Sequence, residues 1–149
     1  MLENTYVLIT DQNHDYIIEQ GEETRTFSVA DKEENVYNKA ATCKWKYSKW
    51  NSGKIELWGN CELTDIEIER TFTRTDSPGT YYTLAMPIPL PTNVQVNSSI
   101  YAVCSNAAAG IWISQYNQDN DAAIQIRANA IRPCKSTVYP RIYAWSTWK

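Results

Sequence analysis

Alternation between apolar and polar residues is the dominant pattern along the chain. It is clearest at residues 55–63, where one parity holds Ile55, Leu57, Gly59, Cys61 and Leu63 and the other holds Glu56, Trp58, Asn60 and Glu62. A period of two predicts a β-strand with one solvated side. Trp58 is therefore an aromatic residue on an otherwise polar face, so we expect it either to pack under another element or to bind a partner.

A β-hairpin is predicted where this run meets the alternating run before it. Asn51, Ser52 and Gly53 separate the two runs, and a loop of this composition closes with Gly53 at a positive φ. The apolar parity then changes between Leu63 and Ile66, which predicts a bulge or bend in the strand near residues 64–65.

Further alternating runs cover much of the remaining chain. They occupy residues 66–72, 82–90, 94–104, 111–116, 122–130 and 141–148, and short apolar runs also lie at residues 6–9 and 15–21. Pro87, Pro89 and Pro91 interrupt the run that begins at Tyr82. Because proline cannot donate a hydrogen bond to a ladder, we expect this strand to become an edge or an extended arm from Met86 onward.

Two segments depart from simple alternation. Tyr101 and Val103 make the end of the 94–104 run apolar on both faces, which predicts burial between two layers. Residues 19–35 are acidic and polar, and we expect a turn or loop there.

No convincing amphipathic helix is present, so the many short strands predict an all-β protein. We expect an antiparallel β-sandwich or jelly roll with a short N-terminal strand or stalk segment, and a closed barrel is the alternative. The length of 149 residues suits one domain. We assign residues 1–40 to the N-terminal strand, linker or stalk segment and residues 41–149 to the β-sandwich head domain.

Composition narrows the classes of function. The formal net charge is −3 and the basic residues form no block, so we expect no nucleic-acid partner. No apolar run approaches the length of a membrane span and no signal peptide is visible, so we expect assembly in the cytoplasm without membrane insertion. The 10 tyrosines and 6 tryptophans outnumber the 2 phenylalanines. Such amphipathic aromatics suit interfaces and ligand grooves, although β-proteins are also rich in aromatics for packing alone.

The four cysteines are Cys43, Cys61, Cys104 and Cys134, and their spacing matches no zinc-binding pattern. The even count permits two disulfides, with three possible pairings. Because no export signal is visible, we expect buried free thiols instead.

Candidate catalytic and metal-binding residues have simpler interpretations. His14 is the only histidine and lies in an expected loop. Two sets of carboxylates each lie at period two on a polar face, which indicates solvated strand surfaces rather than a glycosidase pair. One set is Asp65, Glu67 and Glu69, and the other is Glu56 and Glu62. The Asp119–Asp121 turn matches a calcium loop only weakly. We therefore expect a protein that is not an enzyme and that uses neither cofactor nor metal.

A carbohydrate site is the better hypothesis for the later turns. Sugars stack their C–H faces on aromatic rings, and their hydroxyls bond to amides and carboxylates. The residues that offer this chemistry together are Trp112, Tyr116, Asn117, Asp119, Asn120 and Asp121. Because one face of the 111–116 strand must lie inside, the alternative is that Trp112 packs in the core and the turn is only solvated.

The hairpin resembles a known family. The segment WKYSKWNSGKIELWG is similar to a tryptophan-rich segment in C-terminal head domains of tail-tip, fibre and baseplate proteins of phages and prophages of Gram-positive bacteria. The matching positions are Trp45, Tyr47, Lys49, Trp50, Asn51, Ser52, Gly53, Glu56, Trp58 and Gly59. The stretches 15–21 and 142–149 are similar to the lead-in and to the aromatic-lysine ending of such domains.

The chain also departs from the family pattern. Ser48 stands where arginine is usual, which removes a cation that could pair with Glu56 across the hairpin. Leu57 stands where cysteine is common, and residues 145–147 replace a more typical Gly-Arg pair. These changes leave the expected fold intact and weaken any inference of a shared ligand.

The resemblance implies an all-β head domain on a phage virion, a homotrimer that contacts other tail proteins and adheres to a host surface glycan. The first hypothesis is therefore a receptor-binding head, and the alternative is a structural virion module, such as a trimerisation or capping tip, without its own ligand. An enzyme acting on glycans is a third, weaker hypothesis.

The shared pattern also implies that the hairpin is scaffold or subunit interface, through Trp45, Tyr47, Trp50 and Trp58. On that interpretation Trp58→Ala lowers stability or assembly, by about 3–5 kcal/mol if the ring is fully buried.

Overall fold

The computed structural model describes residues 14–30, 37–73, 80–96, 100–106, 110–115 and 123–149. Within these ranges the regular secondary structure is entirely β-strand, so the expected all-β fold is confirmed. The strands are β1 (Ile17–Ala30), β2 (Tyr37–Trp50), β3 (Lys54–Ile68), β4 (Arg70–Thr73), β5 (Thr80–Pro89), β6 (Tyr101–Asn106), β7 (Ile111–Gln115), β8 (Ala123–Ala130), β9 (Cys134–Val138) and β10 (Pro140–Thr147).

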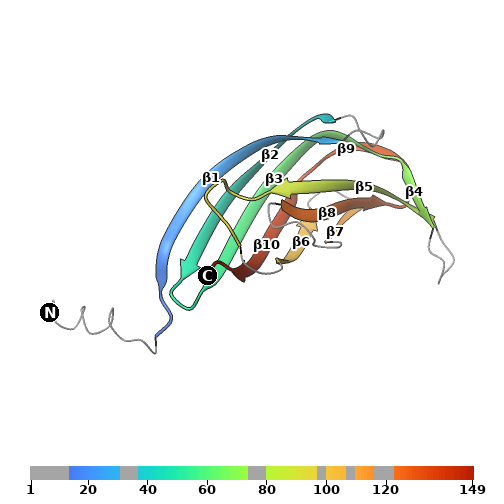
Figure 1. Cartoon of the computed structure of the whole chain (residues 1–149). Helices are drawn as coiled ribbons and strands as arrows, with labels where there is room; N and C mark the ends of the chain where they lie inside the picture. The colour runs from blue at the N-terminus through green and yellow to red at the C-terminus, as the bar shows by residue number, and fades with distance from the viewer. Residues whose placement is uncertain (1–13, 31–36, 74–79, 97–99, 107–109, 116–122) are drawn as a thin grey trace, which may run out of the picture.

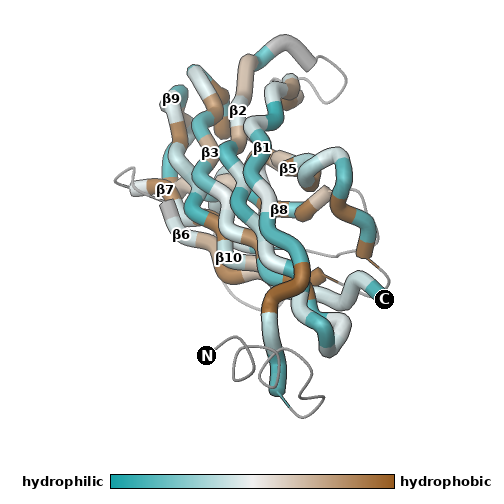
Figure 2. Tube along the Cα trace, turned by 90° about the vertical axis from the view of Figure 1, so that its left-hand side faces the viewer, coloured by the Kyte–Doolittle hydropathy of each residue, from teal (hydrophilic) through white to brown (hydrophobic). Residues whose placement is uncertain are grey.

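The strands form two antiparallel sheets that pack as a β-sandwich. The large sheet has the order β1-β2-β3-β10-β6, with β9 also paired to β3, and the small sheet has the order β4-β5-β8-β7. Figure 1 shows the long strands β1, β2 and β3 arching over the small sheet. Figure 2 shows β1, β2 and β3 side by side in the large sheet, with hydrophilic residues along β1. Of the segment 1–40, the described residues lie in or beside β1 and β2 of the large sheet.

The core lies between the two sheets and follows the predicted alternation. On β3 the parity of Ile55, Leu57 and Leu63 is buried, and it faces Met86, Ile88, Ile124 and Ile126 of the small sheet within one hydrophobic cluster. Complete burial of one such side chain contributes about 1.5–3 kcal/mol to folding, which makes this parity the main determinant of the strand's orientation.

Both local features predicted around the hairpin are confirmed. Gly53 has φ 98°, and its N–H donates to Trp50 O at 3.0 Å to close the loop between β2 and β3. The register of β3 against β9 shifts between Leu63 and Ile66, where Asp65 takes a positive φ of 52°. Because of this bulge, the apolar residues before it and those after it both point into the core, although they have opposite parity in the sequence.

The loop expected at residues 19–35 is wrong for its described part. Residues 19–30 belong to β1, which pairs with β2 almost along its whole length. Glu23 and Arg25 lie at inward-facing positions of β1, and both form hydrogen bonds with residues that are distant in the sequence. Arg25 Nη1 donates to Leu90 O at 2.6 Å, and Thr92 N and Oγ1 both donate to the Glu23 carboxylate at 2.6 Å. These hydrogen bonds lower the pKa of Glu23.

The proline-rich part of β5 is an edge, as predicted, but it does not leave the sheet at Met86. It stays paired with β8 through Pro89. On its other side β4 pairs only with residues 80–83, so the prolines lie where no second ladder needs their missing N–H.

The predicted burial of Tyr101 and Val103 between layers is wrong. Their exposed fractions are 59% and 61%. They lie on β6, the edge strand of the large sheet, with side chains on its outer face. The inner side of this edge is closed by Gln115 of β7, which accepts from Ala102 N at 2.9 Å and donates to Ile100 O at 3.0 Å.

The expectation of free thiols is wrong for one pair. Cys43 and Cys61 are opposite each other on β2 and β3, and they form a disulfide. Cys104 and Cys134 are free and half-buried, and burial raises the pKa of the Cys104 thiol to about 11. The chain therefore combines one disulfide with two thiols that are protonated at neutral pH.

Candidate functional site

The outer face of the large sheet carries a set of aromatic side chains that the register of three strands brings together. Tyr143 on β10 pairs with Trp58 on β3 and, on its other side, with Val103 on β6. Two residues further along β10, Trp145 pairs with Glu56 on β3 and with Tyr101 on β6. Because β10 lies between β3 and β6, residues far apart in the sequence become neighbours on one surface.

Four of these rings form a continuous series, which we call the aromatic ladder: Trp58, Tyr143, Trp145 and Tyr101. Successive ring centroids lie 5.7 Å, 5.5 Å and 6.0 Å apart, and the last pair is stacked at 21°. Trp58 is 40% exposed and Tyr101 is 59% exposed, while the two rings between them are half-buried. Exposed aromatic rings gathered on one face make this surface a candidate for binding.

Glu56 holds the ladder in place from the centre of the sheet. Its carboxylate accepts hydrogen bonds from the Tyr143 hydroxyl and from Trp50 Nε1, the latter at 2.8 Å. Lys54 Nζ lies 3.5 Å from the same carboxylate. Burial alone would raise the pKa of Glu56, but the hydrogen bond from Tyr143, the Lys54 charge and the hydrogen bond from Trp50 together lower it.

The same contact affects Tyr143. The hydrogen bond to Glu56, together with burial and the carboxylate charge, raises the pKa of the Tyr143 hydroxyl. The phenol therefore stays protonated and donates, and charge-assisted hydrogen bonds of this kind are stronger than neutral ones. The Tyr143 ring is thus fixed in the middle of the ladder before any partner binds.

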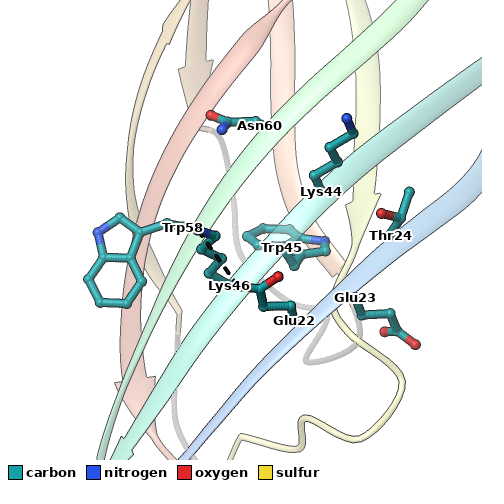
Figure 3. Close-up of a pocket in the computed structure, with 8 residues that line it drawn as sticks. All are labelled: Glu22, Glu23, Thr24, Lys44, Trp45, Lys46, Trp58 and Asn60. Atoms are coloured by element: carbon teal, nitrogen blue, oxygen red, sulfur yellow. Dashed lines mark ion pairs between the residues drawn. The ribbon is translucent and has the colours of Figure 1, made fainter.

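A polar hollow of about 320 Å³ lies beside Trp58. Its lining comes from β1, β2 and β3: Glu22, Glu23, Thr24, Lys44, Trp45, Lys46, Trp58 and Asn60. Figure 3 shows Trp58 at one side of this hollow and Glu22 at the other, with Lys46 between them. Lys46 Nζ lies 3.7 Å from Glu22 Oε1, and both side chains are more than 70% exposed, so this ion pair is weak and open to exchange for a ligand.

The hairpin residues of the family-like segment divide into two groups. Trp45 is 1% exposed, its Nε1 donates to Pro89 O at 2.9 Å, and it links the two sheets. Tyr47 is also buried, over Gly21 of β1. A Cβ at Gly59 would lie 2.8 Å from the Trp45 ring, so glycine is required where β3 passes that ring. These residues are scaffold within one chain.

The loop end of the hairpin is fixed by contacts with both ends of the described chain. Asn51 Oδ1 accepts from Tyr16 N at 2.8 Å, and Trp148 Nε1 donates to Trp50 O at 2.9 Å. Lys49 Nζ lies 2.7 Å from Glu19 Oε2. Trp58 is the most exposed of the three tryptophans of this segment, at 40%, whereas Trp45 is buried and Trp50 is half-buried. Much of the Trp58 ring is therefore accessible to a partner.

Trp112, the aromatic residue of the site predicted on the later turns, is exposed. Its exposed fraction is 43%, it lies on the small sheet, and its ring centroid is 6.0 Å from that of Tyr81. Asn129 Nδ2 donates to Trp112 O at 3.3 Å. The other predicted ligand residues lie outside the described residues: Tyr116, Asn117, Asp119, Asn120 and Asp121. The alternative that Trp112 packs in the core is wrong.

Metal-binding clusters and membrane-spanning helices are both absent from the described part of the chain. Among those residues, no group of histidine, cysteine, aspartate and glutamate side chains could hold a metal ion. Those residues also include no helix long and apolar enough to cross a membrane.

Comparison with known proteins gives no match to a family model, a curated protein or a solved structure.

Proposed function

We propose that this domain is the receptor-binding head of a phage tail tip or fibre and that it adheres to carbohydrate on the host cell surface. The observation that carries the proposal is the aromatic ladder, with two exposed rings and a polar hollow beside one of them. Pyranose rings have apolar C–H faces that stack on Trp and Tyr, and hydroxyls that need donors and acceptors nearby.

The hollow supplies those donors and acceptors next to Trp58. Asn60 offers both a carbonyl and an amide group, Lys46 donates, and Glu22 accepts. All three side chains are exposed, so they bind a sugar without first losing a buried partner. A platform of this openness gives weak binding per site, and several copies on one particle would raise the avidity.

The virion setting of this proposal comes from the resemblance of the hairpin. A homotrimeric head on a phage tail, held by other tail proteins, would present three such surfaces to the host cell. Strong adhesion then follows from multivalency even where one site binds only weakly.

A structural virion module is the second candidate. Val103 and Tyr101 are 61% and 59% exposed on the edge strand β6, and exposed apolar side chains of this kind also occur at subunit contacts. In that case the ladder contacts another copy of the chain and binds no glycan.

A binding assay combined with light scattering separates the two candidates. Labelled protein is applied to Gram-positive cell walls and to a glycan array, and its oligomeric state is measured for the wild type and for Trp58→Ala. Carbohydrate adhesion predicts glycan binding that Trp58→Ala removes without changing the oligomer. Loss of the oligomer in Trp58→Ala, with no glycan bound by the wild type, supports the structural module.

A further inference from the structure

The two most exposed rings of the aromatic ladder lie at its opposite ends. Trp58 is on β3 and Tyr101 is on β6. They are separated by two strand spacings across the sheet and by two residues along the strands. With strands about 4.8 Å apart and about 3.4 Å per residue, these positions are about 12 Å apart in the plane of the sheet. A single pyranose ring cannot cover both.

Among the described residues, the ladder is open at each end along this diagonal. Tyr101 lies on the edge strand of the large sheet, and in the described part of the chain no further strand of that sheet encloses the ladder there. At the other end Trp58 borders the polar hollow, which continues across β2 to β1. A closed ligand pocket buries most of the surface of its ligand. This surface is instead a track with two exposed platforms.

The size of the track favours a narrow ligand over a protein partner. The ladder and Val103 occupy two rows on three strands, which is about 200 Å² of sheet surface. A stable protein interface covers about 800 Å² on each partner, and more than half of that area is apolar. The surroundings are polar, with Lys46 and Asn60 beside Trp58 and Arg141 next to Tyr143 along β10. An apolar surface of this size with a polar rim fits one extended chain better than a second subunit.

We infer that the ligand is an internal stretch of a linear polysaccharide that lies across β3, β10 and β6, with one sugar stacked on Trp58 and another, further along the chain, stacked on Tyr101. The sugar between them passes over the half-buried rings of Tyr143 and Trp145. This inference rests on the proposed carbohydrate function and specifies the form of its ligand.

A length series of sugars tests the inference. The probes are a cell-wall polysaccharide from Gram-positive bacteria and its fragments, separated by size from monosaccharide to long oligosaccharide. Affinity is measured by titration calorimetry for the wild type, Tyr101→Ser and Trp58→Ala. Tyr16→Ser is the matched control, because Tyr16 is 38% exposed and lies outside the ladder. A thermal unfolding curve for each variant checks that it folds.

The inference predicts that fragments long enough to reach Tyr101 bind about tenfold more tightly than the monosaccharide, a gain of about 1.4 kcal/mol. Tyr101→Ser removes this gain and leaves the monosaccharide affinity unchanged, whereas Trp58→Ala weakens every fragment. Tyr16→Ser changes neither. Equal affinity for all fragment lengths, or a Tyr101→Ser variant that binds long fragments as well as the wild type, overturns the inference and leaves carbohydrate binding intact. If no fragment and no intact polysaccharide binds the folded wild type, the proposed function itself is wrong.

Discussion

Trp58 and Tyr143 face each other across β3 and β10, and their ring centroids lie 5.7 Å apart on the outer surface of the sandwich. Tyr143 also donates a hydrogen bond to Glu56, which lies two residues before Trp58 on the same strand. The exposed ring of Trp58 therefore stands beside an aromatic ring whose position is set by a partly buried carboxylate. A preorganised platform of this kind loses little side-chain entropy when a ligand binds.

The hydrogen bond between Tyr143 and Glu56 predicts a pH-dependent contribution to stability. Because the pKa of Glu56 is lowered in the folded protein, its contribution is complete above the ordinary carboxyl pKa of 4.5 and is lost as pH falls through the lower folded value. Tyr143→Phe removes one of the hydrogen bonds that lower the pKa of Glu56. We expect the difference in free energy of unfolding between wild type and variant to be about 1–2 kcal/mol at neutral pH and to shrink in acid. Urea unfolding across this pH range measures it, and a difference that is constant with pH contradicts the assignment.

Gly59→Ala should destabilise the fold through Trp45. The added Cβ lies 2.8 Å from the Trp45 ring and 3.1 Å from Cys43 Sγ, and both of those side chains are buried. We expect a loss of about 1–3 kcal/mol, measured by urea unfolding, because a well-packed core does not accept extra volume without strain. The neighbouring variant Asn60→Ala is the control, since Asn60 is exposed on the same strand. Equal stability of the two variants would show that Trp45 can move aside.

Gln115→Ala should loosen the side of the sandwich where β6 meets β7. It leaves Ala102 N–H and Ile100 C=O without their side-chain partner, at a cost of about 1 kcal/mol for partly solvated groups. Hydrogen exchange at the Ala102 amide should become faster than in the wild type, with the amides of the central strand β10 as internal controls. Unchanged protection at Ala102 would mean that the Gln115 side chain does not close this edge in solution.

The disulfide predicts a specific pattern of thiol reactivity. In protein purified without reductant and then unfolded, Cys104 and Cys134 should be alkylated, whereas Cys43 and Cys61 should react only after reduction. Reduction should lower the free energy of unfolding by about 2–3 kcal/mol or less, since the bond crosslinks a short hairpin loop. Peptide mass spectrometry identifies the alkylated residues, and four reactive cysteines before reduction would contradict the pairing.

Features that depend on neighbours along the sequence could be predicted from it. The turn at Gly53, the bulge at Asp65 and the buried parity of β3 all follow from patterns within a few residues. The disulfide also had a signal in the sequence. Cys43 and Cys61 are equally far from Ser52, the centre of the hairpin loop, so the hairpin register alone places them opposite each other.

Features that depend on distant partners could not be predicted. Glu23 and Arg25 are polar residues that are typical of a loop in the sequence. Their hydrogen-bond partners, Thr92 and Leu90, are distant in the sequence, so the long strand β1 could not be predicted. The short polar strand β9 likewise depends on its pairing with β3.

The aromatic ladder is the clearest example in the candidate site. Alternation within residues 141–148 puts Tyr143 and Trp145 on the same face of the last strand. It could not place them between Trp58 and Tyr101, because that position requires β10 to lie between β3 and β6. The sequence pattern therefore favoured Trp112, which lies on the other sheet, and the turn predicted after it.

A direct comparison of Trp58→Ala with Trp112→Ala tests the central claim, because the two rings are 40% and 43% exposed on different sheets. Both variants should fold, since neither side chain is fully buried. In titration calorimetry with Gram-positive cell-wall polysaccharide, we predict that Trp58→Ala weakens binding about tenfold or more, the loss of about 1.4 kcal/mol or more expected for a stacked ring, while Trp112→Ala binds as the wild type does. A Trp112→Ala variant that loses binding while Trp58→Ala keeps it would contradict the assignment of the site to the outer face of the large sheet.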